Sequence, residues 1–176
     1  MGIFRNGVFY LKNSNSAGNA DNTFAYGAAT DKPIVGDWTG QGKDTVGVFR
    51  NGVFYLKDSN SEGNADNTFA YGAANDVPIA GDWNGDGTTT VGIFRNGAFF
   101  LASSNTNGGG ELTIFSFGQA GDDPVVGDWN ADGATEVGVF RSGAVYLADS
   151  NISGGGYVTA FTYGMAGDEP VAGLWT

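Results

Sequence analysis

The stretch GDWNGDGTTTVGIFR, residues 81–95, decides the fold because it returns along the chain. Closely similar stretches are GDWTGQGKDTVGVFR at residues 36–50 and GDWNADGATEVGVFR at residues 127–141. The Phe-Arg pair that ends each stretch also stands at residues 4–5, and Gly-Leu-Trp stands at residues 173–175. The spacing is 45 or 46 residues, so the chain holds four copies of one unit.

We expect the four units to form a single domain over residues 1–176. The units cover residues 1–45, 46–90, 91–136 and 137–176. The first two differ at 11 positions, which indicates a recent or deliberate duplication. The 31 glycines interrupt the chain too often for helices of ordinary length. A period of this size in a chain of short strands predicts an all-β fold, a β-propeller of four four-stranded blades.

Each unit divides into four strand-like runs, which in and around the second unit are residues 45–50, 52–59, 67–72 and 77–83. Asn51-Gly52 predicts a two-residue hairpin between the first two runs. One aromatic pair and one tryptophan per unit are expected to pack between neighbouring blades. They are Phe24/Tyr26, Phe69/Tyr71, Phe115/Phe117 and Phe161/Tyr163, with Trp38, Trp83, Trp129 and Trp175.

Composition excludes several kinds of chemistry. The chain has no cysteine and no histidine, which removes disulfides, thiolate sites and the usual general base. Its net charge of -11 disfavours a nucleic-acid partner or an anionic membrane surface, and it favours cations. No apolar run approaches the roughly 20 residues of a membrane span. The first ten residues lack the layout of a signal peptide, so a secreted protein would be represented here by a processed piece.

The stretches at 81–95 and 127–141 resemble the FG-GAP (integrin-type) repeats of bacterial exported proteins and integrin α-chains. The resemblance covers all four units and implies propeller blades with a calcium loop between the innermost and second strands. The chain would then begin at a second strand and end at an innermost strand. The C-terminal strand, residues 169–176, would close the ring by pairing with the N-terminal blade. The family usually has seven blades, so four units leave the ring size open between a closed monomer and two chains sharing one eight-bladed ring.

The resemblance also implies ligands at positions 1, 3, 5 and 9 of each loop and a carbonyl at position 7. In the third loop these are Asp128, Asn130, Asp132, Glu136 and the carbonyl of Ala134. In the second they are Asp82, Asn84, Asp86, Thr90 and the carbonyl of Thr88. In the first they are Asp37, Thr39, Gln41, Thr45 and the carbonyl of Lys43. An EF-hand is excluded because Ile93 stands where its twelfth-position Glu would be, and a fourth loop is missing because Leu174 replaces the first Asp.

Two interpretations of these loops stay open. Oxygen ligands followed by a glycine suit calcium, but Asp, Asn and Gly are also the commonest residues of plain turns. If calcium binds, the number of carboxylates predicts the order of affinity: residues 128–136 first, then 82–90, then 37–45. Binding in the weak range of extracellular modules, ~0.1–1 mM, is expected, and the role of the ion would be structural.

Antiparallel strand order sorts the remaining polar residues onto two rims. One rim carries an arginine and an aspartate per unit: Arg5, Arg50, Arg95 and Arg141, with Asp31, Asp76, Asp122 and Asp168. They are interpreted as repeated ion pairs in preference to an anion-binding ring. The other rim carries the candidate metal loops and a Ser-Asn pair per unit at residues 14–15, 59–60, 104–105 and 150–151. These pairs either hydrogen-bond sugar hydroxyls or satisfy their own backbone.

The sequence therefore predicts a non-catalytic, calcium-supported module for adhesion or interaction, at the cell surface or outside the cell. An enzyme is not expected, because the acidic residues repeat with the blades whereas a catalytic site breaks such symmetry. One alternative is a carbohydrate-binding lectin, and a glycan or a protein is then the ligand. Another is a structural or self-assembling scaffold, natural or engineered. A monomer is expected, and the dimer is its rival.

Overall fold

The computed structural model describes residues 1–152 and 157–173, and this part of the chain contains fifteen β-strands and one short 3-10 helix. The strands of the first half are β1 Gly2–Arg5, β2 Val8–Leu11, β3 Asn22–Ala25, β4 Lys32–Gly36, β5 Thr45–Arg50, β6 Val53–Leu56, β7 Asn67–Ala70 and β8 Val77–Gly81. The second half contains β9 Thr90–Arg95, β10 Ala98–Ala102, η1 Asn107–Gly109, β11 Leu112–Ser116, β12 Asp123–Gly127, β13 Glu136–Arg141, β14 Ala144–Ala148 and β15 Tyr157–Thr162.

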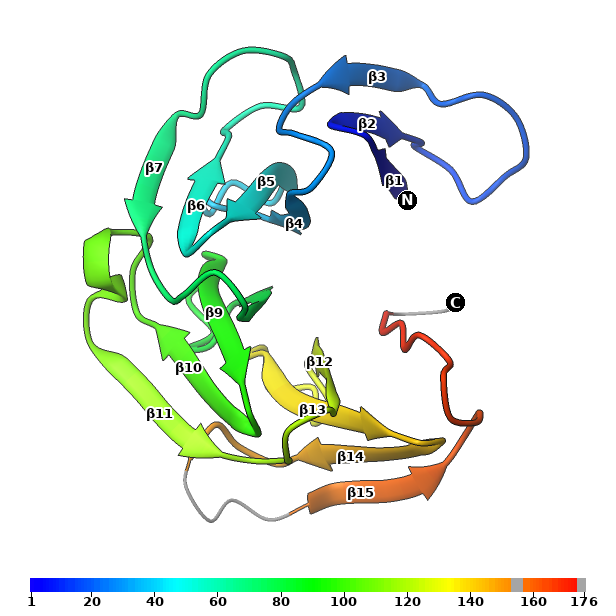
Figure 1. Ribbon diagram of the computed structural model, residues 1–176, viewed down its shortest axis with the longest axis vertical. Helices are drawn as coiled ribbons and strands as arrows, with labels where there is room; N and C mark the ends of the chain where they lie inside the picture. Colours follow the sequence, from blue (N-terminus) through cyan, green and yellow to red (C-terminus); the bar gives the residue numbers. More distant parts are fainter. Residues whose placement is uncertain (153–156, 174–176) are drawn as a thin grey trace.

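The strands form four antiparallel sheets arranged in a ring like a four-bladed propeller (Figure 1). The first blade is β1-β2-β3, and the others are β4 to β7, β8 to β11 and β12 to β15, each in sequence order. The innermost strands β4, β8 and β12 lie next to one another around the centre (Figure 1). Each sequence unit therefore spans two blades, because its last strand is the innermost strand of the next sheet.

The strand positions expected from the second unit are confirmed, with shorter ends. The run expected at 45–50 is β5, whereas the run expected at 52–59 shortens to β6 and the run expected at 77–83 ends with β8 at Gly81. The lost ends belong to loops. Lys57, for example, donates from its ammonium group to the carbonyl of Asn64 across the long loop that comes after β6.

The hairpin expected at Asn51-Gly52 is present. Asn51 has φ 52° and Gly52 has φ 84°, the left-handed pair that a type I′ turn requires. A Cβ on Gly52 would lie 2.9 Å from the carbonyl oxygen of Gly72, so the position also needs glycine for the close approach of the next link. The equivalent turns begin at Asn6, Asn96 and Ser142.

The core lies between neighbouring blades. Phe24 and Tyr26 of the first blade pack with Val46 and Val48 of the second. The second and third blades meet through Phe69, Tyr71, Val91 and Ile93, and the third and fourth through Phe115, Val137 and Val139. Trp38 is buried in the second of these junctions, and Trp83 packs against the third. Three aromatic pairs thus confirm the packing expected of them.

The fourth aromatic pair corrects that expectation. Phe161 and Tyr163 are exposed, because no further blade covers this face within the described part of the chain. The expected pairing of residues 169–176 with the first blade is not shown: residues 169–173 are not in a strand, and β1 has β2 as its neighbour in a three-stranded sheet. Leu174 and Trp175 lie outside the described residues. Strand β1 and the segment at residues 169–173 stand on either side of an opening in the ring (Figure 1).

In the described residues, no helix has the length and apolar character needed to cross a membrane.

Candidate functional site

The three candidate metal loops each connect the innermost strand of a blade to its second strand. They come directly after β4, β8 and β12, and each begins with the Gly-Asp-Trp sequence. A Cβ on Gly81 would lie 2.5 Å from the ring of Trp83, so glycine lets the tryptophan fold back over the strand end. The aspartate between them is left facing the rest of its loop.

The second loop gathers its expected side chains around its own backbone. The N–H of Asp86 donates to Oδ1 of Asp82 at 3.1 Å and to Oδ1 of Asn84 at 3.3 Å. Asp82 also accepts from the N–H of Gly87 at 2.7 Å, and the Asn84 amide donates to Asp86 at 3.0 Å. Two ligand-type oxygens therefore converge on one point, which is also the arrangement of an Asx-type turn.

The third loop repeats this geometry. The N–H of Asp132 donates to Oδ1 of Asp128 at 3.2 Å and to Oδ1 of Asn130 at 2.9 Å. The Asn130 amide donates to Asp132 at 3.0 Å, and the N–H of Gly133 donates to Asp128 at 3.0 Å. The side-chain oxygens of Asp128 and Asn130 therefore converge on one point, as in the second loop, and carboxylate and amide oxygens are the ligand type that calcium prefers.

Glu136 distinguishes the third loop from the other two. Its side chain is buried, and Oε2 accepts a hydrogen bond from the N–H of Trp129 at 3.1 Å. Burial raises the pKa of Glu136, and the neighbouring charges of Asp132 and Asp128 raise it further against the lowering effect of the Trp129 N–H. The loop thus contains a buried carboxylate whose pKa is affected by the charges of two others, and a cation would offset this repulsion.

The first loop is built around one carboxylate. Asp37 Oδ1 accepts from the N–H of Thr39 at 3.3 Å and from the N–H of Gln41 at 3.0 Å, and Oδ2 accepts from the N–H of Gly42. Burial works to raise the pKa of Asp37, but these backbone donors outweigh it and the pKa is lowered. The carboxylate is satisfied by the loop itself, as the turn interpretation requires.

The remaining expected ligands are engaged in other bonds. The hydroxyl of Thr90 donates to the carbonyl of Ala102 at 2.8 Å, away from the loop. Thr88 and Ala134 were expected to offer carbonyl oxygens; their N–H groups donate to Asp86 and Asp132 at 2.8 and 2.9 Å, which leaves those carbonyl oxygens unassigned. No three acidic side chains within residues 1–152 and 157–173 form a group that could hold a metal ion. A bound ion would therefore depend on amide and carbonyl oxygens as well as carboxylates.

Neighbouring loops are bonded to one another, which sequence reasoning missed. The N–H of Asp37 donates to the hydroxyl of Thr89 at 3.0 Å, and the N–H of Thr89 donates back to the Asp37 carbonyl at 2.8 Å. Asp82 and Thr135 repeat this exchange one blade further on, at 3.1 and 2.6 Å. The sequence signal for these bonds was the Thr at the eighth position of the second and third loops. Each loop is thus anchored to the next blade.

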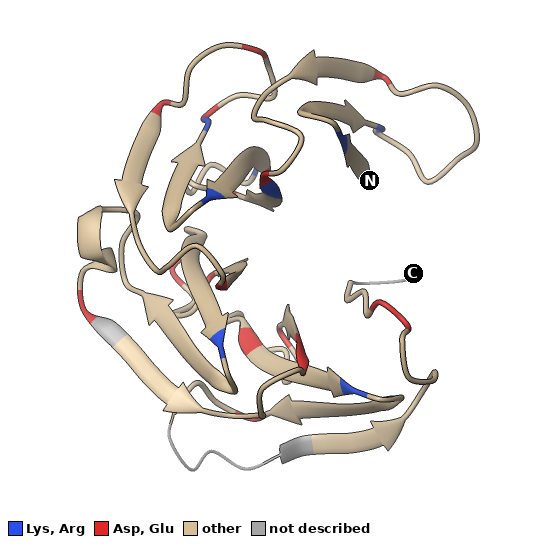
Figure 2. Cartoon of the chain, viewed as in Figure 1, with Lys and Arg blue, Asp and Glu red and all other residues tan. Residues whose placement is uncertain are grey.

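On the opposite rim, the repeated ion pairs expected from the sequence are confirmed in three blades. Arg50 binds Asp31 through two hydrogen bonds of 2.6 Å, and Arg95 binds Asp76 in the same way. Arg141 binds Asp122 through two bonds of 2.7 Å. Basic residues accordingly mark β5, β9 and β13 in Figure 2.

The aspartates of these pairs are buried and held ionised. Burial works to raise the pKa of Asp76, but the hydrogen bonds from Arg95 and from the N–H of Ala73 outweigh it, so the pKa is lowered. The pKa values of Asp31 and Asp122 are also lowered. Burial works to raise them, but hydrogen bonds from Arg50 and Arg141 and from backbone N–H groups outweigh it. The arginines are occupied, and this rim has little positive charge to offer an anion.

The Ser-Asn loops mostly satisfy their own surroundings. Asn60, Asn105 and Asn151 donate to backbone carbonyls of the metal loop in the same blade, at 3.1, 2.9 and 2.7 Å. The Ser59 hydroxyl bonds that of Ser61 at 2.8 Å. These bonds fix the long loop to the candidate metal loop and explain the recurring Asn without a sugar.

No family model, no curated protein and no solved structure matches this chain.

Proposed function

We propose that this chain is a calcium-supported β-propeller module of the FG-GAP type that binds a partner without transforming it. Weak calcium sites suit a location at the cell surface or outside the cell, where calcium reaches millimolar levels. We expect the loop at residues 128–136 to bind calcium most tightly and the loop at 82–90 less tightly. The loop at 37–45, with one carboxylate, contributes least.

One observation carries the calcium proposal. Glu136 is buried, and its pKa is raised by burial and by the charges of Asp132 and Asp128 in the same loop. A cation bound in this loop would offset the repulsion between these charges and stabilise the fold. The convergence of Asp128 and Asn130 on the N–H of Asp132 supplies the loop geometry that such an ion needs.

Binding is favoured over catalysis by how the charged groups are used. Arg50, Arg95 and Arg141 are each held by a buried aspartate, and the groups recur identically from blade to blade. A general acid and base need two groups in different environments, which repeated identical pairs do not provide. A rim that repeats the same groups from blade to blade suits a module that presents a binding surface to a partner.

Calorimetric titration with calcium tests the metal proposal. Asp132→Asn keeps the size of the side chain and removes one charge from the third loop, and Asp86→Asn does the same in the second. We expect Asp132→Asn to lower the heat of binding most, Asp86→Asn to lower it less, and Gln41→Ala to leave it unchanged. A titration without heat, together with a melting temperature that ignores both calcium and chelator, would contradict calcium support.

The kind of ligand requires a separate measurement. The chain is applied to a glycan array and to a set of extracellular matrix proteins, with calcium and with chelator. Calcium-dependent binding to a protein supports the interaction module, and calcium-dependent binding to glycans selects the lectin. If the chain binds neither a glycan nor a protein, the adhesion proposal is contradicted and the structural scaffold remains.

We also propose that residues 169–176 supply the missing fourth strand beside β1. The three complete blades support this, because β4, β8 and β12 occupy that place and residues 169–173 are their equivalents in the repeat. This strand pairing would remove the two free edges of the open ring.

A further inference from the structure

The three candidate metal loops follow one another along one rim, and neighbouring loops are in contact. The second loop meets the third where a Cβ on Gly85 would lie 3.6 Å from the backbone nitrogen of Ala134. The first loop meets the second where a Cβ on Gly40 would lie 2.8 Å from the hydroxyl oxygen of Thr88. In both contacts the fourth position of one loop meets the seventh position of the next, where the ligand carbonyl is expected. A movement of one loop therefore changes the contacts of its neighbour.

Thr135 holds the second loop to the third. Its hydroxyl accepts from the N–H of Asp82 at 3.1 Å, and its own N–H donates to the Asp82 carbonyl at 2.6 Å. Its methyl group lies against Gly81, where a Cβ would come within 2.7 Å of Cγ2. The carbonyl of Thr135 accepts from the side-chain amide of Asn151 at 2.7 Å, so the residue is also held within its own blade. Thr135 thus fixes the backbone of Asp82 from a position that is itself fixed.

The place of Thr135 in the chain connects two sets of expected ligands. In the third loop it stands between Ala134, whose carbonyl is expected to bind calcium, and Glu136. In the second loop the residue that it holds is Asp82, the expected first ligand. An ion bound in the third loop would fix the residues on both sides of Thr135. The fixed Thr135 would then hold Asp82 in place for an ion in the second loop.

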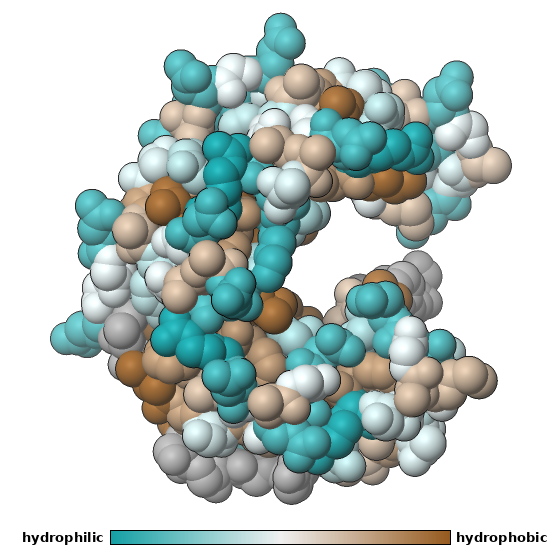
Figure 3. Space-filling model, viewed as in Figure 1, coloured by the Kyte–Doolittle hydropathy of each residue, from teal (hydrophilic) through white to brown (hydrophobic). Residues whose placement is uncertain are grey.

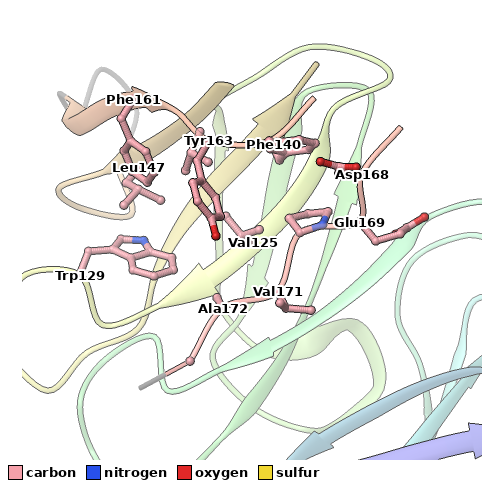
Figure 4. A pocket seen from close by; sticks show the side chains of 14 residues that line it. Val125, Trp129, Phe140, Leu147, Phe161, Tyr163, Asp168, Glu169, Val171 and Ala172 are labelled. Carbon is pink, nitrogen blue, oxygen red and sulfur yellow. The ribbon is translucent and has the colours of Figure 1, made fainter. Parts of the chain in front are cut away.

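The third loop is the last of the series in the described part of the chain. It belongs to the fourth blade, whose far face is uncovered, so that Tyr163 is exposed there. Figure 3 shows the opening in the ring beside this blade, and Figure 4 shows Trp129 of the third loop among the side chains that line the hollow. Within residues 1–152 and 157–173, no later loop follows that could hold Asp128 in the same way. A bound ion should therefore order the third loop more than the second.

We propose that Thr135 positions Asp82 and couples the second loop to the third, so that calcium in one loop strengthens the binding of calcium in the other. The inference rests on the calcium binding proposed above. An ion that orders the shared contact lowers the cost of ordering it for the next ion, which is positive coupling without a change of fold. The effect is reciprocal, because each site changes the affinity of the other by the same factor. Thr89 holds Asp37 in the same way, but the first loop is expected to bind calcium least.

Two glycine amides allow calcium binding to be followed in each loop separately. The N–H of Gly87 donates to Asp82 and the N–H of Gly133 donates to Asp128, so their signals in a nitrogen–proton correlation spectrum report on the second and third loops. Asp132→Ala removes a ligand from the third loop alone. We expect this change to raise the calcium concentration at the midpoint of the Gly87 titration by about fivefold or more, as coupling between sites usually does.

Thr135→Val shows whether this effect depends on the threonine hydroxyl. Valine keeps the shape and the methyl contact with Gly81, but it cannot accept from the N–H of Asp82. In this background Asp132→Ala should move the Gly87 midpoint by less than about twofold, because only the screened loss of one charge remains. Thr135→Ser is the matched control: it keeps the acceptor oxygen and should keep the full shift.

The outcomes separate the coupling from calcium binding itself. If Gly87 and Gly133 both respond to calcium, but Asp132→Ala shifts the Gly87 midpoint equally in the unchanged chain and in Thr135→Val, the coupling is overturned and calcium binding stands. If Asp132→Ala leaves that midpoint unchanged or lowers it, the coupling is overturned without any change at Thr135. If neither glycine responds to calcium, the calcium proposal is contradicted and the coupling fails with it.

Discussion

Arg95 and Asp76 meet at two points: Nε donates to Oδ1 and Nη2 donates to Oδ2, each at 2.6 Å. Asp76 is buried, whereas the side chain of Arg95 is partly exposed and lies over the ring of Phe100, with 5.2 Å to the ring centroid. Because the carboxylate has no access to water, it depends on the arginine and on the N–H of Ala73. The pair therefore ties the link before β8 to the end of β9.

Arg95→Lys should destabilise the protein although it keeps the charge. An ammonium group reproduces one point of contact and loses the planar two-point geometry. We expect the free energy of unfolding in urea to fall by about 1 kcal/mol, discounted for the exposed arginine. Lys43→Arg, at an exposed position of the first loop, is the control and should change little. Equal stability of Arg95→Lys and the unchanged chain would show that the pair is not held in two-point form.

Acid should weaken the fold through the three buried aspartates. Their pKa values are lowered in the folded state, since arginine and backbone hydrogen bonds outweigh burial. Such groups contribute stability that is complete above the unfolded pKa of about 3.9 and is lost as the pH falls through the folded pKa. We expect the free energy of unfolding to drop below about pH 4.

Asp76→Asn isolates one of these contributions. It should be less stable than the unchanged chain at pH 7, and the difference should shrink as the pH falls below about 4, since the unchanged carboxylate is then protonated too. Urea unfolding at several pH values measures this difference. If the difference in the free energy of unfolding between the two proteins stays constant with pH, the pKa of Asp76 is the same in the folded and unfolded chains.

Tyr71→Phe should stabilise the second blade. The Tyr71 hydroxyl is buried without a hydrogen-bond partner in the described structure, and burial raises the pKa of Tyr71 to about 12. The third blade has Phe117 at the equivalent position, so the site accepts a ring without a hydroxyl. We expect the free energy of unfolding to rise by about 1 kcal/mol, with Tyr55→Phe as a neutral control. A loss of stability would reveal a partner for the hydroxyl.

The repeat made much of the fold predictable, since equivalent residues face equivalent neighbours. Strand β5 and the Asn51-Gly52 turn were expected from local patterns in one unit, and the pair of Arg50 with Asp31 was expected from residues that recur once in every unit. The candidate loops were found because their residues are close together in the chain. Whether their oxygens face an ion or their own backbone depends on hydrogen-bond directions, which spacing alone does not determine.

Other relations between units were not revealed by the sequence. Asp37 and Thr89 are 52 residues apart, and their exchange of hydrogen bonds leaves only the recurring Thr as a trace in residue type. Phe161 and Tyr163 have the same residue pattern as their buried equivalents, and their exposure depends on whether another blade lies against them. Periodicity identifies a blade, but the ring size depends on the rotation at each junction.

Glu136→Gln tests the third loop directly. The pKa of Glu136 is raised by burial and by Asp132 and Asp128, so its contribution to stability is present below the unfolded pKa and is lost as the pH rises through the folded pKa. At pH 7 the ionised side chain therefore opposes folding when no cation is bound. Glutamine keeps the shape and removes the charge, so without calcium we expect the variant to melt at a higher temperature than the unchanged chain.

Calcium should reverse the order of the two proteins. At 100 times its dissociation constant, calcium stabilises a site by about 2.7 kcal/mol. The unchanged chain keeps the carboxylate of Glu136, so calcium should raise its melting temperature more than that of Glu136→Gln. Magnesium should substitute poorly because it requires a tighter octahedron. Glu62→Gln, on an exposed loop, controls for net charge. If Glu136→Gln melts lower without calcium, the repulsion is absent, and if both proteins respond equally to calcium, Glu136 takes no part in binding the ion.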